Sequence, residues 1–300
     1  MSLVFGITHS LDLQATLDFL THNLHQISSL HKNVILLGFG FMIVAIAFKF
    51  GVVPFHMWVP DVYEGSPTPV TAIIGSIAKL AAFGFLFRLF IFALGDLHFY
   101  WQTLFLIFGL LSVIIGNLGA LLQNNLKRLF AYSTISHIGF LFLSLSCATK
   151  LGYDAAIFYM TSYALMTVGA FGIILLLQYK ENRGADISDY IGLNKRHPWI
   201  SLLMLLFLLS FAGIPPFIGF DGKLFVFSAM LDMHQPAYVV AVFIGLLMSV
   251  VGAYYYLKII KNIYFDNKDP LDADIEFNRE NLKTSLVGVD SFLLTMNGLF

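Results

Sequence analysis

Three lysines lie inside long apolar stretches of the chain, where a charged amine is costly: Lys49, Lys79 and Lys223. Lys79 lies roughly 15 Å into its stretch at about 1.5 Å per residue, too deep for its side chain to reach water. Near the bilayer centre a lysine costs about 2.5–3.5 kcal/mol on insertion scales, so each one needs an explanation. A buried amine is destabilised as a cation and can load and release a proton, so these residues predict a proton relay. The alternative is structural, with each amine bound by backbone carbonyls at a helix break.

Two histidines also lie within apolar stretches. His137 has Ser133, Thr134 and Ser136 beside it, a setting that fits a proton relay and a hydrogen-bonded packing role equally well. The second is His56. Two histidines can ligate a haem, but no cleft of small residues on facing helices is evident, so the sequence disfavours haem binding.

The composition requires that these residues be held by helices in a membrane. The chain is 58% hydrophobic and 12% charged, too little polar surface to cover a water-soluble globule of 300 residues. Lipid offers no hydrogen-bond partner to the backbone, so only helices or a closed barrel can span a membrane. The long apolar runs of this chain favour helices. The net charge of −1 and the scattered basic residues give no reason to expect nucleic acid. A single cysteine, Cys147, excludes iron–sulfur or zinc ligation by thiolates, and no phosphate-binding glycine loop is present.

Hydropathy predicts seven membrane-spanning helices and a doubtful eighth. The apolar segments lie at about 33–59, 68–94, 100–123, 129–148, 155–179, 198–231 and 237–262, with a weak one near 286–300. We therefore expect an extramembrane segment at 1–32, a transmembrane helical domain at 33–262, and a polar linker with the doubtful helix at 263–300. Trp58, Trp101 and Trp199 fall at segment ends, as expected for rings in the headgroup region.

Two of these segments should be discontinuous. As one helix, 198–231 would measure roughly 50 Å, against a hydrocarbon core of about 30 Å. The sequence from Gly213 to Pro216 supplies a break, and segment 33–59 has the same character at Gly51 and Pro54. The two segments are five spans apart and so cross in opposite directions, which is typical of inverted repeats around an ion site.

The distribution of basic residues predicts the orientation. If the chain alternates sides, one side carries Lys127, Arg128, Lys180, Arg183, Lys195, Arg196, Lys258 and Lys261, and the other carries Lys32, Lys150 and Arg88. The richer side should be cytoplasmic. On that side we expect residues 60–69, with three prolines, to form a rigid turn in which Asp61 and Glu64 have a structural or docking role.

The motifs that carry these residues resemble a known family. The stretch 53–72 reads VPFHMWVPDVYEGSPTPVTA and leads to Lys79, the stretch 125–139 reads NLKRLFAYSTISHIG, and GIPP at 213–216 leads to Lys223. Over residues 33 to 262 the chain is similar to subunit N of bacterial NADH-quinone oxidoreductase, respiratory complex I, a family of antiporter-like membrane subunits.

This resemblance implies an all-α, antiporter-like bundle with two discontinuous helices in the bacterial inner membrane. Lys49, Lys79 and Lys223 would match the family's relay lysines, and His137 would match a histidine often found there. The resemblance further implies a proton-translocating subunit without a redox centre of its own. NADH, flavin, iron–sulfur clusters and quinone would then bind to partner subunits, and the lipid bilayer and other membrane-arm subunits would surround this chain.

Two departures from the family pattern matter. Family members normally begin with about six further helices, one of which carries a glutamate that partners the first lysine. We therefore expect a truncated product, a misplaced start or a split gene. Asp221 stands where an apolar residue is expected, and it could pair with Lys223 and hold it charged.

Three interpretations of the function stay open: a proton-translocating subunit, a subunit of a cation/proton antiporter or membrane-bound hydrogenase of the same superfamily, and a structural half-subunit that conducts no protons.

Overall fold

The computed structural model describes residues 5–6, 29–93, 98–178 and 186–266, and within these ranges the chain is helical without a named strand. The long helices are α3 (Ser29–Phe50), α7 (His98–Leu121), α8 (Leu126–Ser146), α9 (Lys150–Leu177) and α13 (Pro236–Tyr264). The others are α4 (Trp58–Gly65), α5 (Thr68–Gly75), α6 (Ile77–Leu86), η1 (Phe87–Ala93), η3 (Ile187–Tyr190), α10 (Leu193–Arg196), α11 (Pro198–Ala212) and α12 (Ile218–Leu231). The weak segment near 286–300 and almost all of 1–32 lie outside the described residues.

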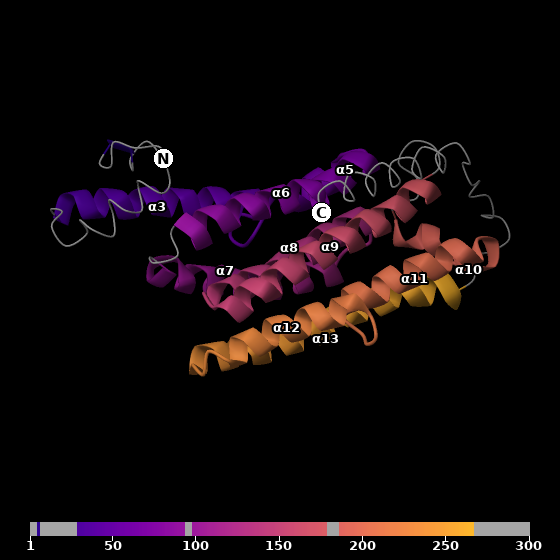
Figure 1. Ribbon diagram of the computed structural model, residues 1–300. Coiled ribbons are helices and arrows are strands. Elements are labelled where there is room, and N and C mark those ends of the chain that lie inside the picture. Colours follow the sequence, from indigo (N-terminus) through magenta and orange to yellow (C-terminus); the bar gives the residue numbers. More distant parts are fainter. Residues whose placement is uncertain (1–4, 7–28, 94–97, 179–185, 267–300) are drawn as a thin grey trace, which may run out of the picture.

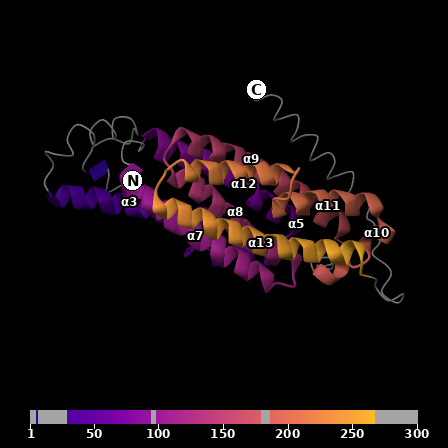
Figure 2. The ribbon, with the colours of Figure 1, turned by 90° about the horizontal axis from the view of Figure 1, so that it is seen from below.

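The helices run side by side along one common direction (Figures 1 and 2). In Figure 1, α3, α6 and α5 form one row, α11 to α13 form the opposite row, and α7, α8 and α9 lie between them. Five stretches are long and apolar enough to cross a membrane: Thr68–Ile91, Trp101–Leu121, Leu126–Ser146, Lys150–Leu177 and Pro236–Tyr264. Leu37–Phe50 and Pro198–Ala212 are shorter apolar helices, each followed by a break. Each of the seven predicted segments thus contains helix.

Both predicted discontinuities are present, and they are built alike. The helix α3 ends at Phe50, and Gly51 follows in the left-handed region with φ 72°. The helix α11 ends at Ala212, and Gly213 follows with φ 77°. Glycine ends helices in this way because it has no Cβ to clash in the left-handed conformation. The fold is therefore an all-α membrane bundle with two discontinuous helices, as the sequence predicted.

The first broken helix is longer than predicted. Residues 60–69 were expected to form a turn, but α4 covers Trp58–Gly65 and α5 begins at Thr68. Prolines are tolerated in the first turn of a helix, where the missing N–H needs no partner, and both Pro60 and Pro69 lie there. As a result, Trp58 is the first residue of α4, next to the break, and its indole N–H donates to the Phe48 carbonyl at 2.9 Å.

The segment 68–94 is also less regular than predicted. It breaks at Ser76, between α5 and α6, and it closes with the π-helical stretch η1. The helix α6 carries Lys79 on its buried side, so the irregularity begins three residues before a predicted site residue. Irregular backbone at membrane depth is tolerated where protein rather than lipid surrounds it.

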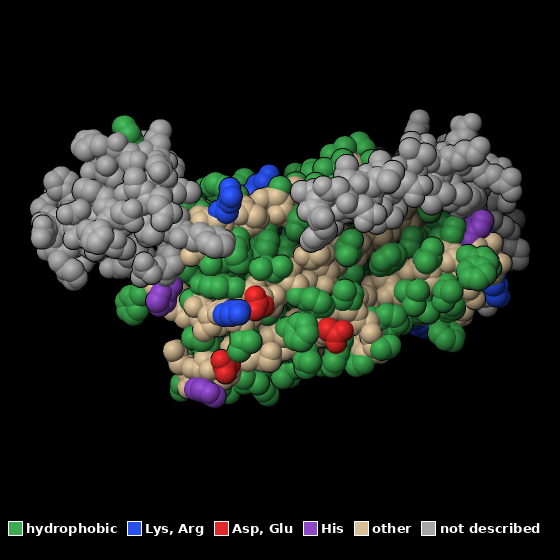
Figure 3. Space-filling model, viewed as in Figure 1, with side chains coloured by type: hydrophobic (Ala, Val, Ile, Leu, Met, Phe, Trp, Pro, Cys, Tyr) green, Lys and Arg blue, Asp and Glu red, His purple; other side chains and the backbone are tan. Residues whose placement is uncertain are grey.

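The helix α8 forms the core of the bundle, with nearly every residue buried. It lies very close to α7, because glycines leave no room between them. A Cβ on Gly116 would lie 2.5 Å from the Ser136 backbone nitrogen, and a Cβ on Gly139 would lie 2.8 Å from the Gly109 carbonyl oxygen. Small residues at helix contacts are typical of membrane bundles. The face seen in Figure 3 shows many apolar side chains and few charged ones among the described residues, as a lipid-facing surface requires.

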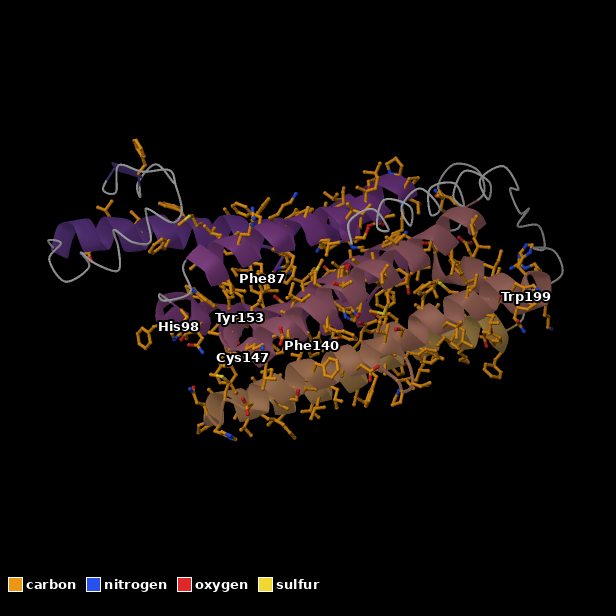
Figure 4. All side chains as sticks on the ribbon, in the orientation of Figure 1. Phe87, His98, Phe140, Cys147, Tyr153 and Trp199 are labelled. Atoms are coloured by element: carbon orange, nitrogen blue, oxygen red, sulfur yellow. The ribbon has the colours of Figure 1, made fainter. Side chains whose placement is uncertain are left out.

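One end of the bundle gathers six of the twelve Lys and Arg residues that the structure describes: Lys127, Arg128, Lys195, Arg196, Lys258 and Lys261. Backbone hydrogen bonds from Ile187 to Asn124 and from Gly192 to Asn262 tie the loops of this end together. The Arg128 guanidinium bridges Asp61 at 3.0 Å and Glu64 at 2.6 Å, so these carboxylates hold α4 against α8. Trp199, 78% exposed, lies at this end, and His98 lies at the opposite end (Figure 4). We refer to the two ends as the basic end and the opposite end.

We predict that the basic end is cytoplasmic, because Lys127, Arg128, Lys195 and Arg196 all belong to it. A cysteine introduced between Tyr190 and Lys195 should react with an impermeant thiol reagent only from the cytoplasmic side, and one introduced at His234 only from outside. Both experiments use a Cys147→Ser background. Labelling of both positions from the same side would contradict the arrangement of the spans.

Candidate functional site

Lys79 lies in the interior of the bundle, at 2% exposure, and its partner belongs to the first helix break. Its Nζ donates to the carbonyl oxygen of Phe50, the last residue of α3, at 2.9 Å. The last carbonyls of a helix have no partner within the helix and carry the negative end of its dipole, so a cation is favourable there. The amine therefore occupies a helix C-terminus at membrane depth. Lys79 can act as a cap, as a proton site, or as both.

Lys49 differs from the other two lysines because its side chain is exposed at the surface of the described chain. It is the penultimate residue of α3, and it lies close enough to Lys79 for the two amines to repel each other. The positive charge of Lys49 therefore opposes a positive charge on the Lys79 amine. The structure brings these two predicted site residues together at the first break.

Lys223 occupies the second break in the same way as Lys79 occupies the first. Its Nζ donates to the carbonyl oxygens of Phe211 at 3.2 Å and Ala212 at 2.9 Å, at the end of α11. The amine also lies 5.7 Å from the centroid of the Phe140 ring, which α8 directs toward α12 (Figure 4). This distance is within the range of a cation–π contact.

The expected ion pair between Asp221 and Lys223 is absent from the contacts of the described residues. Asp221 lies on the exposed side of α12, whereas Lys223 is only 7% exposed. Residues two apart on a helix point in nearly opposite directions, since each residue advances about 100° around the axis. The backbone carbonyls of α11, rather than Asp221, therefore bind the amine.

His137 is buried and has a hydroxyl partner at each ring nitrogen. Its Nδ1 shares a hydrogen bond with the Tyr159 hydroxyl at 2.8 Å, and its Nε2 shares one with the Tyr256 hydroxyl at 3.3 Å. Tyr256 is in turn hydrogen-bonded to Ser133. Lys223 lies within electrostatic range of the imidazole, so the charge states of the two groups depend on each other. The structure therefore joins His137 and Lys223 in one polar cluster.

The tyrosines of this cluster were not predicted from the sequence. Tyr159 and Tyr163 are four residues apart on α9 and so share a face, and Tyr163 donates to Thr134 at 2.8 Å. Tyr256 comes from α13, more than a hundred residues from His137. Tyrosine adds little to a hydropathy signal, so only the spacing of Tyr159 and Tyr163 could have indicated a polar face.

The described residues contain no group of three or more His, Cys, Asp or Glu side chains that could hold a metal ion. What the geometry offers instead is a series of ionisable side chains in the bundle. Two lysines bind the ends of broken helices, a third lies beside the first of them, and a histidine with tyrosine partners lies beside Lys223. This arrangement defines a class: multi-pass membrane proteins with discontinuous helices and ionisable residues at the breaks.

Comparison with known proteins identifies the family within that class. The family described as "NADH:quinone oxidoreductase/Mrp antiporter, TM" matches residues 1–249, and the chain belongs to it. The chain is 44% identical to NADH-quinone oxidoreductase subunit N of Ruthia magnifica subsp. Calyptogena magnifica, over 90% of this chain and 54% of that protein. It is 42% identical to the subunit N of Nitrosomonas europaea, over 100% of this chain and 60% of that protein. The resemblance inferred from the motifs is thus confirmed.

A solved structure agrees with this assignment. Respiratory complex I from Thermus thermophilus with bound aureothin contains a chain that superposes with a TM-score of 0.70 at 31% identity. The match covers 89% of this chain and 56% of that chain. This chain thus spans a little over half the length of the relatives that it matches.

Proposed function

We propose that this chain carries protons through the membrane part of an NADH-quinone oxidoreductase, with Lys49, Lys79, His137 and Lys223 as the proton-binding groups. Asp221, which faces away from Lys223, has no place in the relay. The observation that carries the proposal is the placement of Lys79 and Lys223, whose amines lie in the bundle interior at the ends of two broken helices. Both lysines are almost fully buried, and a charged amine in the membrane interior is costly, so an amine at this depth calls for a function.

The chemistry proposed for this chain is proton transfer alone. Lys79 and Lys223 can each exist as a cation held by carbonyl oxygens or as a neutral amine. Nearby charges influence one another: Lys49 acts on Lys79, and Lys223 acts on His137. A charge that moves at one site therefore changes the proton affinity of the next. In this proposal NADH, flavin, iron–sulfur clusters and quinone bind to partner subunits, and other membrane-arm subunits cover part of the exposed apolar surface.

Two other functions fit parts of the structure. A subunit of a cation/proton antiporter would share the fold and the lysines, and the family description includes Mrp antiporters. A structural half-subunit would keep the carbonyl-bound lysines as caps without conducting protons. The antiporter reading predicts proton movement that needs sodium or potassium and no NADH, and the structural reading predicts no dependence on the lysine amines.

Complementation of a deletion strain separates the three readings. Membrane vesicles from cells that lack this chain should show reduced NADH-driven proton uptake, and the parental gene should restore it. A His137→Gln variant should restore assembly but only part of the uptake, because glutamine can form hydrogen bonds with Tyr159 and Tyr256 but cannot bind a proton near neutral pH. Uptake that follows an imposed sodium gradient without NADH would support the antiporter. Full uptake in the deletion strain would contradict the proposed function.

A further inference from the structure

An acidic side chain lies on the outside of the bundle, near the second helix break. Asp221 belongs to the first turn of α12 and is exposed, and its carboxylate forms no hydrogen bond or ion pair with any described residue. The helix continues from Asp221 to Leu231 at the opposite end, which is about 15 Å at 1.5 Å per residue. Because the hydrocarbon core is about 30 Å thick, the carboxylate lies near its middle.

Lipid would cover this side chain only at a high cost in free energy. Ionisable residues within membrane-spanning segments are rare, and nearly all of them face protein or a water-filled cavity. Protonation does not remove the cost, because the O–H and C=O groups of a neutral acid would then lack hydrogen-bond partners in the hydrocarbon. The dipole of α12 favours a negative charge in its first turn but provides no counter-ion. The carboxylate therefore needs a partner that the described residues do not supply.

The backbone beside Asp221 leads independently to the same conclusion. Pro215 and Pro216 lie in the break between α11 and α12, and both are exposed. Irregular backbone does not face hydrocarbon in membrane proteins; it occurs where protein or water surrounds it. Ile218 and Leu224 lie about one turn before and after Asp221 and are exposed as well, so water alone would leave apolar side chains uncovered. We call these five residues the α12 face, and protein is the covering that suits all of them.

The composition of the α12 face indicates the chemistry of its partner. Apolar side chains flank a single carboxylate, so the complementary surface is a second transmembrane helix that is apolar except for one basic residue at the same depth. Charged side chains in membranes pair with one another, and an amine or guanidinium donates strong hydrogen bonds to a carboxylate. A lysine or arginine on the partner helix would satisfy Asp221. Such a pair fixes the depth and register of two helices more than it adds affinity.

The lysines of this chain do not fit that role. Lys79 and Lys223 bind backbone carbonyls in the interior, and Lys49 lies on α3, in the row of helices opposite α12 (Figure 1). The apolar segment near 286–300 contains no lysine or arginine. If a second copy supplied its Lys49 to Asp221, the contact would join opposite faces and give an open head-to-tail row rather than a closed pair. A different polypeptide is the source that fits.

We propose that the α12 face docks against a transmembrane helix of another membrane-arm subunit, and that a lysine or arginine of that helix binds Asp221. The inference rests on the proposed function for the kind of complex, and it adds which face of this chain makes the contact and which side chain specifies it. It gives Asp221 a role outside the relay and explains how the second break is kept from lipid.

A photo-reactive amino acid in place of Leu224 identifies the neighbour while Asp221 stays unchanged. Illumination of native membranes that contain the assembled complex should link this chain to another membrane-arm subunit. Mass spectrometry should locate the link in an apolar segment, within about one helical turn of a lysine or arginine. Links only to lipid, to a second copy, or to another part of this chain would overturn the inference, as would a partner segment without a basic residue.

Charge variants test the ion pair itself. Asp221→Lys places two cations together and should reduce both the Leu224 link and the assembled fraction on a native gel severalfold, whereas Asp221→Asn keeps an acceptor oxygen and should lose less. Aspartate at the identified basic residue of the partner should restore Asp221→Lys. The matched control is Asp232→Lys, which changes an exposed aspartate just after α12 and should assemble as the parental chain does.

The outcomes separate this interface from the proposed function. If Asp221→Lys does not accumulate in the membrane, the Leu224 link in the otherwise unchanged chain decides. Parental assembly and linking in Asp221→Lys would overturn the inference, even if Lys79→Met has lost proton uptake. Parental uptake in Lys79→Met, with the Leu224 link intact, would instead overturn the proposed function.

Discussion

Replacing Lys79 with methionine is expected to abolish most NADH-driven proton uptake while the complex still assembles. Methionine keeps an apolar stem of similar length and removes the group that binds the proton. The Phe50 carbonyl loses its partner, which costs about 1–3 kcal/mol for a buried acceptor, but the cost of holding a cation in the membrane disappears as well. The two effects oppose each other, so a large loss of stability is not expected. Vesicle uptake and a native gel measure the two quantities separately.

Lys79→Arg distinguishes a relay site from a cap. Arginine keeps a positive charge and N–H donors for the end of α3, but it does not release its proton at accessible pH. A site that only binds the Phe50 carbonyl should tolerate arginine better than methionine, whereas a relay site should lose uptake with both. The control is Lys150→Met, an exposed lysine at the start of α9, which should keep the parental rate. If both Lys79 variants assemble and pump normally, Lys79 is structural.

The fold was predictable from the sequence because a backbone can cross lipid in few ways other than as a helix. Apolar length fixes the spans, and a glycine followed by prolines fixes the two breaks at Gly51 and Gly213. The prediction of a turn at residues 60–69 was wrong because proline is common both in turns and at the start of helices. The three prolines of residues 60–69 were interpreted as a turn, yet Pro60 and Pro69 occupy first helical turns, where proline is favourable.

The candidate site was predictable only in its charged members. Lysine in an apolar segment is conspicuous, whereas Tyr159 and Tyr256 are ordinary residues of a hydrophobic sequence. Their hydroxyls reach His137 only when α9 and α13 are placed around α8, and nothing in the chain order indicates those contacts. The Asp221 interpretation was wrong for the opposite reason: proximity in sequence was taken for proximity in space, although a helix separates residues two apart.

Among glycine-to-alanine substitutions at the second break, Gly219→Ala is expected to cause the largest loss of stability. A Cβ on Gly219 would lie 1.7 Å from the Ser210 carbonyl oxygen and 2.7 Å from its carbonyl carbon. These are backbone atoms near the end of α11, so no side-chain rotation relieves the overlap. Overpacking costs about 1–3 kcal/mol where side chains can yield, and a backbone clash should exceed this. The first turn of α12 would have to move away from α11.

That movement would also disturb the proposed site, because α12 carries Lys223 and α11 supplies the carbonyls of Phe211 and Ala212. We expect Gly219→Ala to reduce the amount of folded chain in the membrane and to lower its denaturation temperature. Gly172→Ala on α9 is the matched control: no heavy atom lies within 4 Å of its added methyl group, and alanine stabilises a helix interior by about 0.5–1 kcal/mol relative to glycine. The two substitutions should therefore shift the temperature in opposite directions. Equal shifts would mean that the close approach of α11 and α12 at Gly219 does not hold this break together.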